Sequence, residues 1–83
     1  MKTVRIPLNE QFLFTQENAG QLARSLAKYD SSIMIHDDNR TVNAKSLLGI
    51  LSLGYVSSPC LVFSLDGTDE EEACETVLRF FQV

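Results

Sequence analysis

The stretch RTVNAKSLLGILSLG, residues 40–54, largely decides the fold prediction. Its second part, Lys45 to Gly54, has leucine or isoleucine at five of ten positions, and these residues surround a helix axis instead of lining one face. A short surface helix normally keeps one side polar. We therefore predict a helix from Ser46 to about Leu53 that packs one side on a core and presents leucines for a contact on the other. Ser46 is a good N-cap because its hydroxyl accepts a free backbone N–H.

A hairpin is predicted immediately before this helix. Residues 31–44 alternate apolar and polar side chains, with Met34 and His36 on the less apolar side. Asp38 and Asn39 tolerate the positive φ angles of a tight turn and therefore separate the two arms.

Two more strands and another helix follow the same periodicity rules. TVRIPL, residues 3–8, and CLVFSLDG, residues 60–67, alternate like half-buried strands. Pro7 places the first strand at a sheet edge, because proline donates no ladder hydrogen bond. Residues 15–29 carry apolar side chains at helical spacing, and Thr15 is the expected N-cap.

The last helix follows Thr68, which is predicted to form a capping box with Glu71. Its predicted buried stripe comprises Ala73, Val77, Leu78 and Phe81. The element order is then β-α-β-β-α-β-α in one α+β domain, residues 1–83, with helices on one face of a sheet. The residues expected on the other, solvated face are Arg5, Met34, His36 and Ser64.

Composition argues against several functional classes. Seven basic and eleven acidic residues give a net charge of −4 without a Lys/Arg cluster, so no direct DNA or RNA binding is expected. No apolar run has the length of a membrane span and the N-terminus resembles no signal peptide, so we expect a cytoplasmic protein without membrane attachment. Cys60 and Cys74 lack metal-ligand spacing and are expected to be free thiols. We expect no metal, no cofactor and no enzymatic activity, because no paired His, paired Cys or Gly-rich loop is present.

The opening stretch contains a distinctive set of residues: Val42, Asn43, Lys45, Ser46, Gly49, Ser52, Leu53 and Gly54. Together with AKYDSSIMI and DGTDEEEA, which match in place, this set resembles the HPr family, small phosphocarrier proteins of the bacterial sugar phosphotransferase system. The register needs no gap from about Phe14 to Glu72 and covers nearly the whole chain. The resemblance implies an HPr-like open-faced β-sandwich: a four-stranded antiparallel sheet in spatial order 1-4-2-3 with three helices on one face.

The resemblance breaks down at the family's phosphorylation site. Family members open the first helix with Gly-Leu-His-Ala-Arg-Pro, whose His carries the phosphoryl group, whereas the same register here reads LFTQENAG. The His position becomes Thr15, the Arg position Glu17 and the Pro position Asn18. Phosphotransfer requires a nucleophile and a helix end that accepts an anion, and the carboxylate of Glu17 repels a phosphoryl group. We predict that this site transfers no phosphate and that His36, on a strand, cannot replace it.

Ser46 corresponds to the serine that a dedicated kinase phosphorylates in many Gram-positive HPr proteins. That modification converts those proteins into corepressors of catabolite-controlled genes. Ser46 either only caps its helix or is also a regulated phosphorylation site. The family Arg that helps hold partners of the modified form is Glu17 here, which argues against the same partner.

The resemblance also explains the excess leucines of the second helix. The family's apolar docking patch beside the His corresponds to Leu47, Leu48 and Leu51. Ile50 and Leu53 are expected to face the core. An exposed apolar patch on a small domain usually marks an interaction surface. The segment Phe12–Phe14 either folds over these leucines or extends the patch.

These observations lead to three functional hypotheses. The first is an HPr-like protein-interaction module without His phosphocarrier activity, related to the sugar phosphotransferase system, whose partner site includes the leucine patch with Thr15 and Glu17. The second is a regulatory phosphoprotein or corepressor switched at Ser46. The third, a diverged phosphocarrier using Thr15 or another residue, is disfavoured because serine and threonine phosphoesters are stable. The expected partners are proteins: a phosphotransferase-system component, the HPr serine kinase or a transcription regulator.

Overall fold

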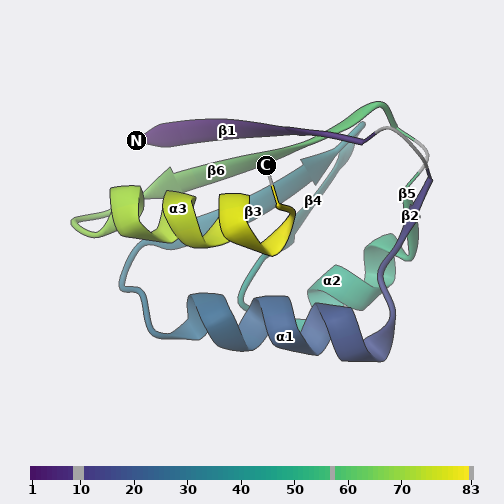
Figure 1. Cartoon of the computed structure of the whole chain (residues 1–83), viewed down its shortest axis with the longest axis horizontal. Coiled ribbons are helices and arrows are strands. Elements are labelled where there is room, and N and C mark those ends of the chain that lie inside the picture. Colours follow the sequence, from purple (N-terminus) through teal and green to yellow (C-terminus); the bar gives the residue numbers. More distant parts are fainter. Residues whose placement is uncertain (9–10, 57, 83) are drawn as a thin grey trace.

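One sheet layer and one helix layer make up the fold (Figure 1). The structure is a computed structural model that describes residues 1–8, 11–56 and 58–82. Its elements are β1 (Lys2–Pro7), β2 (Phe12–Leu13), α1 (Gln16–Ala27), β3 (Ser32–Asp37), β4 (Arg40–Asn43), α2 (Leu47–Leu53), β5 (Tyr55–Val56), β6 (Cys60–Asp66) and α3 (Glu70–Phe80).

The main sheet is antiparallel, with strands in the order β1-β6-β3-β4. Counting only these four strands, this is the predicted order 1-4-2-3, and Pro7 lies on an edge strand as expected. Val4 and Ile35 both pair with Phe63, so these three side chains share the face that the helices cover. The prediction of an open-faced α+β sandwich is confirmed.

The helices bury the apolar stripes that their periodicity predicts. Leu22 and Leu26 of α1, Ile50 of α2 and Val77 of α3 are buried with the inner face of the sheet. Among the described residues, no buried side-chain nitrogen or oxygen lacks a hydrogen-bond partner. Among these residues, the core therefore carries no free-energy cost from a buried side-chain polar atom without a hydrogen bond.

A second, two-stranded sheet was not predicted. It pairs β2 with β5, so that Phe12 opposes Val56 and Leu13 opposes Tyr55. Strands of two residues have no measurable alternation, so this sheet leaves no periodic signal in the sequence. It joins the segment before α1 to the segment after α2.

The predicted capping box at the last helix is wrong. The N-cap of α3 is Asp69 rather than Thr68, and Asp69 makes no side-chain cap bond. Its carboxylate instead accepts the N–H groups of Asp30 (2.8 Å) and Ser31 (3.0 Å) and the Ser31 hydroxyl. Asp69 therefore ties the start of α3 to the loop between α1 and β3, a tertiary contact that outweighs the local capping motif.

Two smaller expectations are only partly met. In the hairpin turn, Asp38 has a positive φ of 53°, whereas Asn39 does not. In α3, Ala73 and Val77 are buried, whereas Leu78 and Phe81 are half-buried at the rim of the core.

Candidate functional site

The N-terminal end of α1 is closed by its own side chains. Thr15 Oγ1 accepts the Asn18 N–H at 3.1 Å, and Asn18 Oδ1 accepts the Thr15 N–H at 2.8 Å. Asn18 Nδ2 also donates to the Leu13 carbonyl at 3.0 Å. This reciprocal capping box satisfies two backbone donors that would otherwise be available to an anion. The prediction that Thr15 caps this helix is confirmed.

Glu17 adds negative charge to the same helix end. It is exposed, lies in the first turn of α1, and forms no ion pair within the described part of the chain. A carboxylate at this position interacts favourably with the positive end of the helix dipole. The helix end is therefore both capped and compensated in charge.

Helix α2 begins at the predicted N-cap. The side-chain oxygen of Ser46, which is half-buried, accepts the Gly49 N–H at 3.1 Å. Lys45, next to it, donates its ammonium group to the Tyr29 carbonyl and so ties the start of α2 to the chain after α1. The backbone N–H of Gly49, which would otherwise be unpaired at the helix start, therefore has a partner.

The three patch leucines differ in exposure. Leu48 is 79% exposed, whereas Leu47 and Leu51 are half-buried and pack against the core. Ile50 and Leu53 are buried, as expected. The predicted patch of three leucines is therefore reduced to one protruding leucine with a partly covered leucine on either side.

In the segment before α1, which was expected either to cover or to extend the leucine patch, two side chains pack inward and one is exposed. Phe14 is buried, while the ring of Phe12 packs edge-on against Phe14 and against Phe81, with centroids 4.9 Å and 5.7 Å away. Leu13, between them, is 48% exposed. It opposes Tyr55, which is 60% exposed, and paired residues of antiparallel strands project to the same side. Leu13 and Tyr55 therefore form a second exposed apolar pair, on the sheet that joins α1 and α2.

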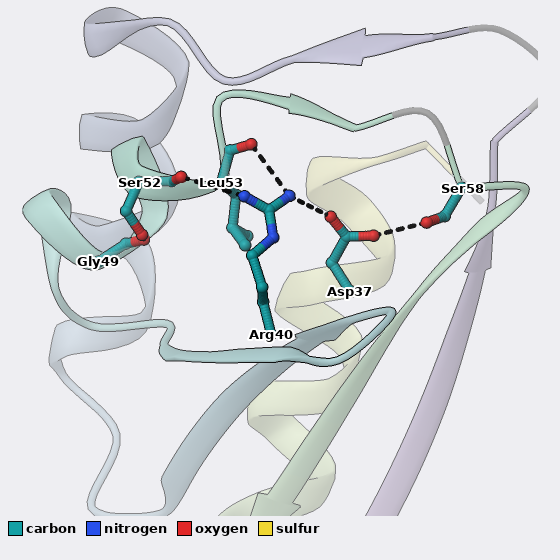
Figure 2. Close-up of polar contacts among 6 residues, drawn as sticks. All are labelled: Asp37, Arg40, Gly49, Ser52, Leu53 and Ser58. Carbon is teal, nitrogen blue, oxygen red and sulfur yellow. Dashed lines mark hydrogen bonds and ion pairs between the residues drawn. The ribbon is translucent and has the colours of Figure 1, made fainter.

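Arg40 fixes the other end of α2 (Figure 2). Its guanidinium donates to the carbonyls of Ser52 (3.3 Å) and Leu53 (3.4 Å), and to the Asp37 carboxylate (2.7 Å). A cation beside the C-terminal carbonyls of a helix satisfies unpaired acceptors and complements the dipole. Arg40 therefore connects the hairpin turn to the last turn of α2.

Asp37 is a buried carboxylate with two donors. Its side chain is 3% exposed and accepts from the Ser58 hydroxyl at 2.6 Å as well as from Arg40. The Ser58 hydrogen bond, followed by the Arg40 guanidinium, holds the pKa of Asp37 below its ordinary value, against the opposing effect of burial. Three segments therefore meet at this carboxylate: the hairpin, the end of α2 through Arg40, and the chain before β6 (Figure 2).

His36 lies on the opposite face of the sheet from the helices. It alternates with buried Ile35, and its ring nitrogens contact the hydroxyls of Thr41 (3.0 Å) and Ser64 (2.9 Å). The main sheet therefore separates this ring from α1. The expectation that His36 is a polar residue on the outer sheet face is confirmed.

The cysteines are free, Cys60 half-buried and Cys74 buried, and burial raises the pKa of the Cys74 thiol. Considering only residues 1–8, 11–56 and 58–82, no group of three or more His, Cys, Asp or Glu side chains is placed to hold a metal. Within the same ranges, no helix combines the length and apolar character needed to cross a bilayer.

Comparison with known proteins gives a consistent result. The family model described as "PTS HPr component phosphorylation site" matches residues 14–82. The phosphocarrier protein HPr of Treponema pallidum is 32% identical over 82 residues, which cover 99% of this chain and 91% of that protein. The chain belongs to the HPr family.

Other HPr relatives support the same placement. The HPr-like protein Crh of Halalkalibacterium halodurans is 36% identical over 55 residues, 66% of each chain. The crystal structure of HPr-C-His from Thermoanaerobacter tengcongensis superposes with a TM-score of 0.86 at 33% identity, covering 99% of this chain and 92% of that one. HPr proteins are phosphocarriers of the phosphotransferase system rather than enzymes.

Two features of this HPr-family surface were missed in the sequence. Leu13 and Tyr55 come together only through the small sheet, and they lie far apart in the chain. Arg40 and the end of α2 are separated by 12 and 13 positions. The single signal for the second feature was an arginine directly after a hairpin turn, which does not distinguish a helix-capping cation from a solvated one.

Proposed function

We propose that this HPr-family protein is a protein-interaction module related to the bacterial sugar phosphotransferase system, and that it does not carry phosphate on histidine. The observation that carries the proposal is the start of α1. In the register read from the sequence, the family's His position is occupied by Thr15, and the Thr15 side chain forms a capping box with Asn18. The single histidine, His36, lies on the far side of the sheet.

The chemistry at this helix end supports the loss of phosphotransfer. A phosphoryl group at a helix N-terminus is stabilised by free backbone N–H groups and by nearby cations. Here Asn18 occupies one N–H, Thr15 another, and Glu17 contributes a negative charge in the first turn. Thr15 as an alternative carrier is disfavoured, because a threonine phosphoester is stable and its oxygen already accepts a hydrogen bond.

The exposed apolar side chains support a retained docking role. Leu48, Tyr55 and Leu13 are three of the large hydrophobic side chains that the described residues expose, and all three belong to α2 or to the small sheet beside it. A small domain that leaves such side chains in water is typical of an interaction surface. A phosphotransferase-system component is the partner that family membership favours, and a cytoplasmic location is part of the same proposal.

Phosphotransfer from phosphoenolpyruvate tests the first half of the proposal. The purified chain is incubated with phosphoenolpyruvate and the upstream enzyme of the system, with a His-bearing phosphocarrier HPr as the positive control. We expect no acid-labile label on this chain while the control is labelled. Label on His36 or Thr15 that disappears in His36→Gln or Thr15→Val would contradict the proposal.

Binding measurements test the second half. Affinities for purified phosphotransferase-system proteins are compared for the wild type, Leu48→Asp and the control Thr3→Asp, whose residue is exposed on β1. We expect Leu48→Asp alone to weaken binding, by about tenfold or more, because it introduces a charge into an apolar contact. Equal affinity of all three proteins would show that α2 is not part of the docking surface.

A second candidate function is regulation by phosphorylation at Ser46. It is favoured by the position of Ser46 at the start of α2 beside exposed Leu48, and by the similarity to the HPr-like protein Crh. The proposal is that the HPr serine kinase modifies this residue and that a transcription regulator then binds the modified form. Incubation with kinase and ATP, followed by mass measurement, should show one phosphate on the wild type and none on Ser46→Ala. The same mass gain, or no gain, in both proteins would exclude this function.

A further inference from the structure

A hollow of about 400 Å³ adjoins the small sheet, and Leu13, Leu48 and Tyr55 do not line it. Its lining residues come from the end of β1, from β2, from the first turns of α1 and from the C-terminal end of α3. These elements are labelled in Figure 1. The lining residues are Ile6, Pro7, Leu8, Phe12, Asn18, Gln21, Phe80, Phe81 and Gln82. Pockets that hold small molecules begin at about 300 Å³, so one compact ligand fits this volume.

The aromatic side chains that line this hollow are held in place by contacts with one another. The ring of Phe81 contacts the rings of Phe12 (centroids 5.7 Å apart) and Phe80 (4.9 Å apart), and Phe63 of the core lies 5.8 Å behind it. Phe12, Phe80 and Phe81 nevertheless remain only half-buried. A ring-containing ligand would complete the burial of side chains that already hold one another in place, at little cost in ordering.

The polar side chains of the hollow define the rest of the ligand. Three carboxamides contribute, and the described residues place no charged side chain in the lining. The Asn18 amide is committed to Thr15 and Leu13, which leaves the exposed Gln21 and Gln82 available. A carboxamide both donates and accepts hydrogen bonds, whereas an ionised ligand group would lose water and find no counter-ion among the described lining residues.

We propose that the hollow is a binding site for one small, uncharged molecule that contains an aromatic ring and a hydrogen-bonding group. The ring lies against Phe12, Phe80 and Phe81, and the polar group bonds to Gln21 or Gln82. The lining of this site differs from the exposed side chains of the docking surface, because Leu13, Leu48 and Tyr55 do not line it.

Two fluorescent probes that differ in one charge test this site. N-phenyl-1-naphthylamine is uncharged and has one N–H, while 8-anilino-1-naphthalenesulfonate has the same rings and a sulfonate. Titrated against the purified chain, the uncharged probe should bind at one saturable site, and the sulfonate should bind about tenfold more weakly or worse. Failure of the uncharged probe to saturate, or equal affinity for both probes, would overturn the proposal.

A matched pair of variants locates the binding. Gln21→Trp places a large side chain at an exposed lining position of the hollow. Gln16→Trp places the same side chain on an exposed position of α1 outside the lining. We expect the first to reduce affinity about tenfold and the second to leave it unchanged. Amide chemical shifts of the wild type supply a readout that does not depend on either variant: probe-induced changes should centre on Leu8, Phe80 and Gln82. Binding unaffected by Gln21→Trp, or shifts centred on α2, would refute the site.

Discussion

Arg40 illustrates how a single side chain positions a functional element in this protein. It is half-exposed, yet it contacts two carbonyls at the end of α2 and the buried carboxylate of Asp37 (Figure 2). Removing the guanidinium would leave that carboxylate with Ser58 as its remaining side-chain donor. A buried charge that loses its counter-ion is costly, more so than the intact pair is stabilising.

Arg40→Met should therefore destabilise the fold by about 1–3 kcal/mol, measured by urea unfolding. Methionine keeps much of the apolar stem, so the loss reports on the guanidinium. Amide exchange in α2 should accelerate, because the last turn loses its cap. The control Arg5→Met, on the exposed outer face of β1, should stay within about 0.5 kcal/mol of the wild type. Equal stability of the two variants would show that Arg40 does not hold α2.

Replacement of Gly67 and of Gly20 by alanine should change the stability in opposite directions. A Cβ added at Gly67 would lie 2.6 Å from the Ser31 Cα, whereas one added at Gly20 would approach no closer than 3.3 Å, to the flexible end of Arg24. Gly67→Ala should destabilise the protein because backbone must move. Gly20→Ala should stabilise it by about 0.5–1 kcal/mol, since alanine favours a helix interior. Thermal melts of both variants test this pair, and a gain in stability for Gly67→Ala would show that the close approach is absent.

At the scale of elements, the sequence predicts whatever is periodic and misses what depends on long-range contacts. The four long strands and three helices were predicted because alternation and helical spacing are local properties. The strand order came from the resemblance to HPr, with Pro7 in agreement, rather than from periodicity. The capping box at Thr68 failed because Asp69 bonds to Ser31, 38 positions away. Local capping motifs cannot reveal such a bond.

The start of α3 supplies the test at this scale. Asp69→Ala should lower the unfolding temperature clearly, because two backbone N–H groups and the Ser31 hydroxyl lose their acceptor. Thr68→Ala, the residue that the sequence suggested as the cap, should change the stability by less than about 0.5 kcal/mol. Differential scanning calorimetry of both variants measures which residue stabilises the start of α3. A larger fall in unfolding temperature for Thr68→Ala would support the capping box predicted from the sequence.

For the whole molecule, acidic groups determine how stability depends on pH. Hydrogen bonds to Asp37, Asp69 and Glu70, made chiefly by Ser58, by Ser31 and by the Gly67 N–H, hold each carboxyl pKa below its ordinary value. A carboxyl whose pKa is lower in the folded than in the unfolded chain stabilises the fold above the unfolded pKa of about 4. That contribution disappears as the pH falls through the folded pKa.

Asp37→Asn separates the buried group from the two surface carboxyls. At neutral pH the variant should be less stable than the wild type by about 1–3 kcal/mol, because Arg40 loses its counter-ion. As the pH falls from about 4 through the lowered pKa of Asp37, the two stability curves should converge, since the wild-type carboxyl becomes protonated in the unfolded chain first and then in the folded chain. Urea unfolding across pH 2–7 measures the difference directly. Curves that stay parallel to the lowest pH would mean that Asp37 does not titrate with folding.

The central claim is that this HPr-family molecule retains a docking surface and has lost the phosphocarrier site. One NMR experiment tests both parts: the ¹⁵N-labelled chain is titrated with the upstream enzyme of the phosphotransferase system in the presence of phosphoenolpyruvate. The account predicts that resonances of Leu13, Leu48 and Tyr55 shift or broaden while no phosphorylated species forms. A second set of resonances for the start of α1, or for His36, that grows with time would show phosphotransfer and contradict the account.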